Sequence, residues 1–417
     1  MNTITPISIL PEELLLEMFI YCWLRNFTDL RLRPEVTLSH VDRHWRKTTI
    51  AAPKLWTRII LFNLKKDLEP ISVYLARSNQ MPIDLVVFLP TSTNSIDLSE
   101  FCQLIEVHLP LLRNLRIHSN NLAEQPLLNL LKPLALPFLN SVRFSLTPQE
   151  AWPAGGPTAI FEGGAPMLSH ICLRRYLPST FQIPIQSATH LCLELSLSEW
   201  RRPESFTWIT AQLASGAPLV FLDLGWIPVI SSDIRTFDIP TLRTLVFGAK
   251  DWITTLKFLR AIIAPSLHHL ILSLPYDSES HDFPESGPIK LQSLQRLTLR
   301  NMVHPCFPHF FQAFPLVTEV YVTDNISFLF FLLCLLGSAE GVNPLGMAWP
   351  NLRVIGTTDE PSFDELKSLL DQRAAKDAPI EKLLLQSKYM AQAREVVHGL
   401  EFPVLVEEFV YRSPFRL

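Results

Sequence analysis

Two short segments of the chain alternate histidine with cysteine, and both residue types bind zinc. They are His170-Ile-Cys172 and His190-Leu-Cys192, twenty residues apart. On neighbouring parallel strands, about 4.8 Å apart, the four side chains would face one side and suit a tetrahedral Zn²⁺. Residues i and i+2 of a strand are about 6.6 Å apart, which is longer than a tetrahedral ligand edge. We therefore prefer an ordinary recognition surface and expect no metal.

Sequence motifs of catalysis are missing from the chain. It has no GxSxG, HExxH, phosphate-binding loop, GxGxxG after a strand, or EF-hand loop, the patterns that carry nucleophiles, metals or nucleotides. No nucleophile can be paired with a base in this sequence, so an enzyme is the least favoured class of protein. We predict a protein that is not an enzyme and has no cofactor.

Arginine and tyrosine recur at positions where a strand would present them to solvent. Guanidinium groups pair well with carboxylates and phosphates, and both residue types are enriched at binding hot spots. The alternative is a solvated face without a ligand. We predict that five of these residues bind a partner protein, which we call the client: Arg116, Arg143, Arg296, Arg300 and Tyr321.

A leucine-rich repeat pattern predicts the elements that position these side chains. The pattern is proline followed by Leu-x-x-Leu-x-Leu, and its units begin 20 to 35 residues apart, the range of one strand plus one helix. In x-Leu-x-Leu-x the leucines face a core and the x residues face outward. The first apolar positions are Leu112, Leu139, Leu168, Ala188, Leu219, Leu242, Leu267, Leu294, Val317, Leu352 and Ile380.

Between these strands the periodicity predicts helices, and proline ends each helical segment before the next strand. Helices are expected over residues 251–264, 362–376 and 388–399, with Asp251 and Ser362 as N-caps. Glycines mark residues 147–164 as an exposed loop. Residues 274–288 are acidic and rich in turn formers, a composition typical of disorder. From residue 79 onward the chain resembles the leucine-rich repeat family.

The N-terminal residues predict a small helical module. Residues 9–19 (ILPEELLLEMF) predict a helix with Pro11 and Glu12 in its first turn. A second helix is expected from about Pro34 through VTLSHVDRHWRKTTI. The LP-E start, the V-x-R-x-W-R core and the APKLW exit resemble the F-box found in large families of mushroom-forming fungi, over residues 6 to about 60. The chain departs from that family at Asp42, where cysteine is common.

The F-box resemblance implies binding to the Skp-type adaptor of an SCF ubiquitin ligase and, through it, to a cullin scaffold. The alternative is that the same apolar residues cap the end of the repeats. The implied adaptor contacts are Leu10, Pro11, Leu14, Leu15, Met18, Phe19, Leu38, Val41 and Trp45.

Composition limits the remaining classes of partner. There are 36 basic and 40 acidic residues without blocks of one sign, so nothing favours nucleic acid or an anionic membrane. The most apolar stretch, residues 326–336, is about half the roughly 20 residues that span a bilayer, so we expect a buried helix. The six cysteines form no CxxC pair, and no secretion signal precedes the first glutamates, so we predict a cytoplasmic or nuclear protein.

The sequence thus predicts an α/β leucine-rich-repeat solenoid with an N-terminal α-helical F-box. Its expected parts are the F-box at 1–60, transitional and irregular first units at 61–108, and the repeat-like solenoid at 109–417. The predicted function is substrate recognition for an SCF-type ubiquitin ligase. The alternative is a leucine-rich scaffold or regulatory protein that does not engage the ligase.

Overall fold

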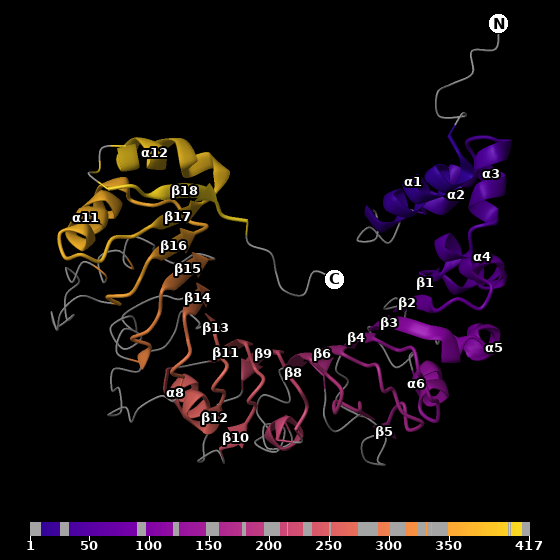
Figure 1. Ribbon diagram of the computed structural model, residues 1–417. Coiled ribbons are helices and arrows are strands. Elements are labelled where there is room, and N and C mark those ends of the chain that lie inside the picture. The colour runs from indigo at the N-terminus through magenta and orange to yellow at the C-terminus, as the bar shows by residue number, and fades with distance from the viewer. Residues whose placement is uncertain are drawn as a thin grey trace, which may run out of the picture. The chain divides into compact units, whose positions relative to one another are not determined.

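Figure 1 shows the computed structural model of the chain, which divides into two compact units, Met1–Ser187 and Ala188–Arg416. We describe each unit by itself. The structure describes residues 10–25, 33–89, 97–119, 125–146, 158–176, 181–195, 209–214, 216–227, 236–249, 252–273, 291–300, 313–323, 331, 335, 349–398, 400 and 402–410.

The first unit begins with helices and continues as alternating strands and helices. Its elements are α1 (Glu12–Arg25), α2 (Pro34–Ser39), α3 (Arg43–Ile50), η2 (Pro53–Trp56), β1 (Arg58–Leu61), α4 (Leu64–Ser78), β2 (Ile83–Leu89), α5 (Ser99–Glu106), η3 (Leu109–Leu111), β3 (Leu112–Ser119), α6 (Gln125–Leu131), β4 (Ser141–Leu146), β5 (Thr158–Ala159), β6 (His170–Tyr176) and β7 (Phe181–Gln182).

The second unit contains more strands than helices among its described residues. Its elements are β8 (His190–Leu195), β9 (Phe221–Ile227), β10 (Phe237–Asp238), β11 (Thr244–Ala249), α8 (Trp252–Ala261), β12 (Ile262–Ile263), β13 (His269–Ser273), β14 (Arg296–Arg300), β15 (Glu319–Thr323), β16 (Val354–Thr357), α11 (Phe363–Ala374), β17 (Lys382–Leu385), η6 (Ser387–Tyr389), α12 (Met390–His398) and β18 (Leu405–Glu408).

Parallel sheet is the main architecture of both units, and fourteen of the described strands belong to it. The order is β1-β2-β3-β4-β6 in the first unit and β8-β9-β11-β13-β14-β15-β16-β17-β18 in the second. Each strand pairs with the next long strand of its unit, an order compatible with a solenoid-like α/β fold. The mixed α/β class predicted from the sequence is confirmed. The sheet also includes β1 and β2, which precede the first predicted repeat, and β18, which follows the last.

The repeat pattern identifies the core correctly. All eleven first apolar positions are at most 1% exposed. The leucines that follow them stack in register, as Leu270 does on Leu245 and Leu297. Removing apolar surface from water stabilises the folded state by about 25 cal/mol per Å². The stacked apolar rows are therefore the main source of stability in each unit.

A shared turn precedes most of these strands and gives the prolines a more specific role than ending a helix. In the turn before β11, the Leu242 amide donates to the Ile239 carbonyl, with Pro240 second in the turn. The same bond closes the turns of the units beginning at 139, 168, 267, 294, 317 and 352. Proline suits this position because its φ is fixed near −65°. The first and last residues of these turns are buried, so each turn adds two side chains to the core.

The outward-facing residues are less exposed than the repeat pattern predicts. Val246, Ile271 and Thr298 lie in one register row on that face, yet they are 6%, 1% and 2% exposed. Val246 and Ile271 form an apolar cluster with Phe221. His269, in the neighbouring row, lies with its Nε2 2.9 Å from the Thr298 hydroxyl, so an outward direction does not by itself place a residue in solvent.

Helix predictions in the second unit are largely confirmed. The described helices α8, α11 and α12 fall within the ranges predicted for them. Ser362 precedes α11 at the N-cap position but makes no capping hydrogen bond through its side chain, and Asp251 lies outside the described residues. Within residues 326–336, Phe331 and Leu335 are described and buried, and no described helix is long and apolar enough to cross a membrane.

One predicted loop is wrong in its described part, and another cannot be assessed. Ile160 and Phe161, in the predicted exposed loop 147–164, are each 2% exposed. A Cβ at Gly163 would lie 2.5 Å from the Ala135 backbone nitrogen, so this glycine allows close packing and does not merely mark a turn. Residues 274–288 lie outside the described residues.

The N-terminal module contains three helices where two were predicted. The expected second helix is divided between α2 and α3 because Asp42 begins a new helix. The Asp42 carboxylate accepts a 2.8 Å hydrogen bond from the Trp45 backbone amide, which is the N-cap arrangement. Asp42 therefore separates α2 from α3 by starting the second of these helices.

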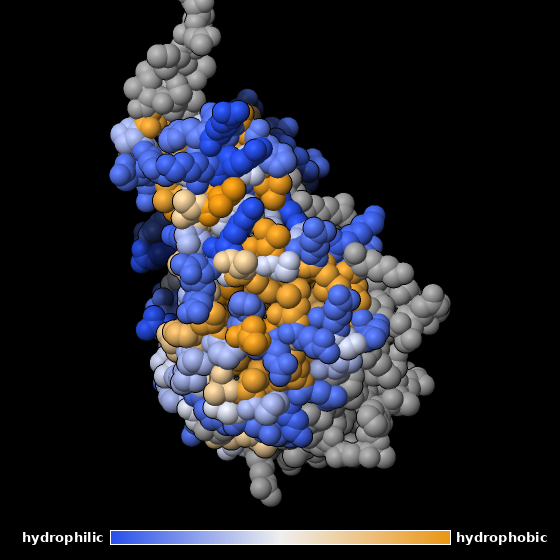
Figure 2. All heavy atoms as spheres, turned by 90° about the vertical axis from the view of Figure 1, so that its right-hand side faces the viewer, coloured by the Kyte–Doolittle hydropathy of each residue, from blue (hydrophilic) through white to orange (hydrophobic). Residues whose placement is uncertain are grey.

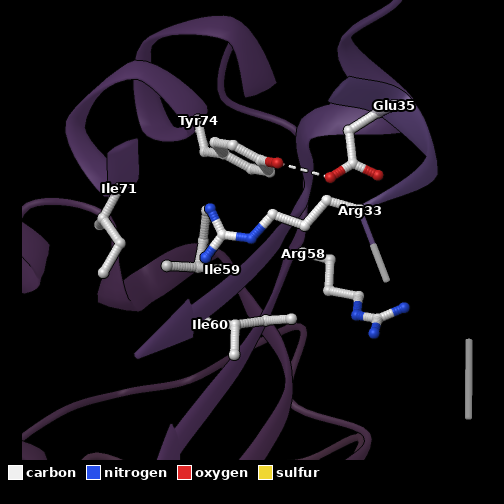
Figure 3. Close-up of a pocket in the computed structure, with 7 residues that line it drawn as sticks. All are labelled: Arg33, Glu35, Arg58, Ile59, Ile60, Ile71 and Tyr74. Carbon is white, nitrogen blue, oxygen red and sulfur yellow. Dashed lines mark hydrogen bonds between the residues drawn. The ribbon is translucent and has the colours of Figure 1, made fainter. Parts of the chain in front are cut away.

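A buried hydrogen bond joins this module to helix α4 of the first unit (Figure 3). The Tyr74 hydroxyl of α4 donates to a Glu35 carboxylate oxygen of α2 at 2.5 Å. Arg33 and Arg58 lie beside the pair and favour the charged carboxylate, but burial outweighs them and raises the pKa of Glu35. The Trp56 indole also donates to the Thr49 carbonyl at 2.8 Å. The cavity at this junction is about 10 Å³, space for about one water molecule and not for a ligand.

The buried glutamate predicts a pH-dependent stability. Because its pKa is raised in the folded chain, the folded state binds more protons between the ordinary glutamate value of 4.5 and the raised pKa. The Glu35 contribution to the free energy of unfolding therefore falls as pH rises through this window. We expect Glu35→Gln to raise the melting temperature relative to wild type increasingly as the pH rises above the ordinary glutamate value of 4.5. Thermal unfolding at several pH values, with exposed Glu69→Gln as control, measures the difference; a constant difference would contradict the assignment.

Candidate functional site

Helix α1 presents an apolar stripe to solvent. Its members are spaced by three or four residues and are between 44% and 64% exposed: Leu14, Met18, Tyr21 and Leu24. Val41, between α2 and α3, is 55% exposed as well. Residues at this spacing share one face of a helix. Exposed apolar side chains that are contiguous on one face mark interaction surfaces.

The opposite side of α1 packs within the module. Leu15, Phe19 and Trp23 are at most 3% exposed. The Phe19 and Trp45 rings are 4.9 Å apart between centroids. This packing fixes which face of α1 points to solvent and leaves the stripe outside.

The nine predicted adaptor contacts therefore fall into three groups. Pro11, Leu14, Met18 and Val41 are exposed, and Leu10, Leu38 and Trp45 are half-buried. Leu15 and Phe19 are buried inside this chain, so their direct role is in the core of the module. The sequence prediction also ended α1 too early and missed Tyr21 and Leu24. The helical periodicity, continued past residue 19, would have found both.

Apolar residues also gather on another face of the first unit. Figure 2 shows hydrophobic residues at the height of α4, α5 and α6, with hydrophilic residues above them. The exposed apolar residues of these elements include Val73 of α4, Val107 directly after α5 and Phe138 after α6. Val107 is 77% exposed. The α1 stripe is thus not the only apolar surface among the described residues of this unit.

Two predicted client-binding arginines meet on the strand face of the first unit. Arg116 of β3 and Arg143 of β4 are register partners. Both line a pocket of about 320 Å³ together with the buried Arg58 of β1. Burial is the largest cause that lowers the pKa of Arg116, and the nearby charges of Arg143 and Arg58 lower it further.

The other predicted client-binding residues lie on the strand face of the second unit. Arg296 of β14 forms a 2.6 Å ion pair with Glu319 of β15, and the Tyr321 hydroxyl donates to the same carboxylate at 2.9 Å. The Arg296 guanidinium also lies 5.6 Å from the Tyr321 ring centroid. Arg300, at the far end of β14, pairs in register with Thr323 and is half-buried. Arg296, Glu319 and Tyr321 therefore form one network of contacts within this chain.

Titration within this network follows from its contacts. Burial would raise the pKa of Glu319, but hydrogen bonds from Arg296 and Tyr321 outweigh it and lower the value. Burial and the Glu319 charge raise the pKa of Tyr321 to about 12. Burial and the Arg296 charge lower the pKa of the neighbouring His269 to about 4. At neutral pH, Arg296 and Glu319 are charged while Tyr321 and His269 are neutral.

The four candidate zinc ligands do not form a metal site in the structure. His170 and Cys172 belong to the first unit, and His190 and Cys192 to the second. The two histidines are half-buried, and both cysteines are at most 5% exposed. Among the described residues, no group of three or more histidine, cysteine, aspartate or glutamate side chains is placed to hold a metal.

A glycine beside Tyr321 provides a test of the network. A Cβ at Gly356 of β16 would lie 2.5 Å from Tyr321 Cδ1, and the ring also stacks on Phe409 at 5.4 Å. We expect Gly356→Ala to displace the ring and to lower the free energy of unfolding by about 1–3 kcal/mol. In a Tyr321→Ala background, Gly356→Ala should cost much less, because the clash is removed. Urea denaturation of the four proteins measures the coupling; equal costs in both backgrounds would exclude this contact.

Comparison with known proteins assigns no family to the chain. No family model matches it, and no curated protein matches it in sequence. What the chain does is therefore inferred from its own residues and contacts.

Proposed function

We propose that the chain is the substrate-recognition subunit of an SCF-type ubiquitin ligase. In this proposal α1, α2 and α3 form an F-box that binds a Skp-type adaptor, which connects the chain to a cullin scaffold. The outward strand faces of a leucine-rich-repeat solenoid bind a client protein. The chain itself performs no chemistry and uses no cofactor. It raises the effective concentration of a client lysine at the ubiquitin-charged enzyme.

The apolar stripe of α1 is the observation that carries the proposal. Leu14, Met18, Tyr21 and Leu24 are each 44% or more exposed, although the same helix buries its other face. Fully burying a large apolar side chain stabilises a complex by about 1.5–3 kcal/mol. A helical partner that covers this stripe would therefore gain substantial binding energy. The LP-E, V-x-R-x-W-R and APKLW segments supply the resemblance that suggests a Skp-type adaptor.

The strand faces supply the client-binding part of the proposal. Their parallel register places outward residues of successive strands in rows, as at Arg296, Glu319 and Val354. Surfaces of this kind suit an extended protein partner, because each repeat adds one strip of contacts. Arg116, Arg143 and Tyr321 are the hot-spot residue types on these faces.

A different set of contacts favours the scaffold alternative. Leu15 and Phe19 are buried, and Glu35 joins the helices to α4 through Tyr74. These contacts are what a capping module needs, because the end of a stack of strands would otherwise expose apolar surface. In this alternative the leucine-rich region binds proteins without ubiquitin ligase engagement.

An adaptor pull-down with the full chain separates the two functions. The variant is Leu14→Glu with Met18→Glu, which places two charges on the exposed stripe and changes no buried residue. We expect wild type to retain a Skp-type adaptor and the variant to lose it, since burying an unpaired charge is strongly unfavourable.

The matched control is Val107→Glu, which charges an exposed apolar residue outside α1. This control should bind like wild type, and circular dichroism should be the same for all three proteins. Adaptor binding that survives the Leu14→Glu and Met18→Glu changes would place the contact elsewhere. A folded wild-type chain that retains no adaptor would favour the scaffold function.

A further inference from the structure

We propose that the strand face of the first unit contains a binding site for a phosphate monoester, formed by Arg58, Arg116 and Arg143. The site goes beyond adaptor binding by α1, and neither depends on the other. It lies on the outward side of β1, β2, β3, β4 and β6, the five ladder strands described in this unit.

The pocket is assembled from two register rows. The first row runs from Arg58 through Asp84, Asn114 and Ser141 to His170. The second row includes Val86, then Arg116 and Arg143. Neighbouring residues within a row are about 4.8 Å apart, and the two rows are about 6.6 Å apart along the strands. Arginine side chains can bridge these distances, and Arg58, Arg116 and Arg143, from three different strands, line the same pocket.

Among the described residues that line this pocket, the only carboxylate is Asp84, and it already accepts hydrogen bonds. Asp84 is 2% exposed. It accepts two hydrogen bonds from Arg113, at 3.0 and 2.7 Å, and a third from Asn114 at 2.6 Å. Arg113 does not line the pocket. Three arginines therefore line the space, while Asp84 is hydrogen-bonded to Arg113 and Asn114 and also attracts Arg116 through its charge.

The charges of these arginines repel one another, as the effect of Arg143 and Arg58 on Arg116 shows. Like charges directly opposite on neighbouring strands destabilise a sheet, and Arg116 and Arg143 are such a pair. Arg58 adds a charge that is 95% buried, since its exposure is 5%. A bound dianion would reverse this penalty by accepting charge-assisted hydrogen bonds from several guanidinium groups at once.

The size and lining of the pocket fit a phosphate and the group that carries it. Its volume of about 320 Å³ is many times the roughly 30 Å³ that one water occupies in the liquid. It lies at the lower end of the range for small-ligand sites, about 300–1,000 Å³. Asn140 and Ser141 add amide and hydroxyl groups to the arginines, while Leu85 and Leu115 belong to the apolar part of the lining.

The second unit provides an internal comparison. A pocket of about 310 Å³ there is lined by Arg243 and Arg296. Arg296 is paired with Glu319, which lines the same pocket. In the pocket of the second unit the strand register places Glu319 beside Arg296. In the pocket of the first unit it places Arg143 beside Arg116. The two pockets are similar in size and differ in charge.

Calorimetric titration of the full chain with phenyl phosphate at low salt tests the site. We expect wild type to bind and the variant Arg116→Gln with Arg143→Gln to lose about tenfold or more in affinity, because each guanidinium contributes a charge-assisted bond. Raising the salt concentration should weaken binding to wild type. Arg296→Gln is the matched control, an arginine on the other strand face, and should bind like wild type.

Three results would overturn the site: no binding to wild type, equal binding to the double variant, or an equal loss in the Arg296→Gln control. Thermal unfolding separates loss of the site from loss of the fold. The double variant without ligand should melt no lower than wild type, because the substitutions remove repulsion. Adaptor retention by the same variant should be unchanged, which distinguishes this test from that of the α1 stripe.

The source of the phosphate is decided by a second ligand. N-acetyl phosphoserine amide represents a phosphorylated protein segment, and phenyl phosphate represents a free phosphate ester. Tighter binding of the phosphoserine compound would assign the site to a phosphorylated client. Tighter binding of phenyl phosphate would assign it to a soluble small molecule, and the dependence on Arg116 and Arg143 should hold for both.

Discussion

In-register burial of apolar side chains between successive parallel strands is the constraint on which the rest of the structure depends. A strand of four to eight residues, such as β16 or β3, is not stable by itself. It persists because its leucines lie on those of the strands before and after it, and because its backbone groups pair on both sides. The turn before most strands supports this arrangement, since its first and last residues are also buried. The prolines reduce the freedom of the unfolded chain at those turns.

The register that stacks the leucines also decides which polar residues meet on the outward face. Once Leu297 lies beside Val320, Arg296 must lie beside Glu319. Once Leu115 lies beside Val142, Arg116 must lie beside Arg143. The apolar core thus determines the electrostatics of a surface that it does not touch. Arg296 and Glu319 therefore form an ion pair, whereas Arg116 and Arg143 bring two positive charges together.

The N-terminal helices follow a different principle. Three short helices cannot bury enough apolar surface to be stable alone. Here they are held to η2 by the Trp56 indole and to α4 by the buried Tyr74–Glu35 hydrogen bond. Attachment through α2 and α4 uses one side of the module and leaves the stripe of α1 in solvent. Burying the glutamate carries an electrostatic cost, which Arg33 and Arg58 reduce. Arg58 also lines the arginine pocket, so one buried cation serves both the anchor and the outward face.

The sequence by itself determined the α/β class, the eleven buried positions that begin the repeats, and the helices near α8, α11 and α12, because periodicity records which side chains leave water. It did not determine that Asp42 divides a helix, that Thr298 is buried, or that Leu15 is buried while Leu14 is exposed. It predicted Arg116 and Arg143 as client-binding residues but did not predict that they share a pocket with Arg58. Those features depend on register and on packing between elements distant in the chain. A local pattern specifies the direction of each side chain relative to its own strand or helix, whereas only the assembled sheet decides which neighbours cover it and which charges it meets.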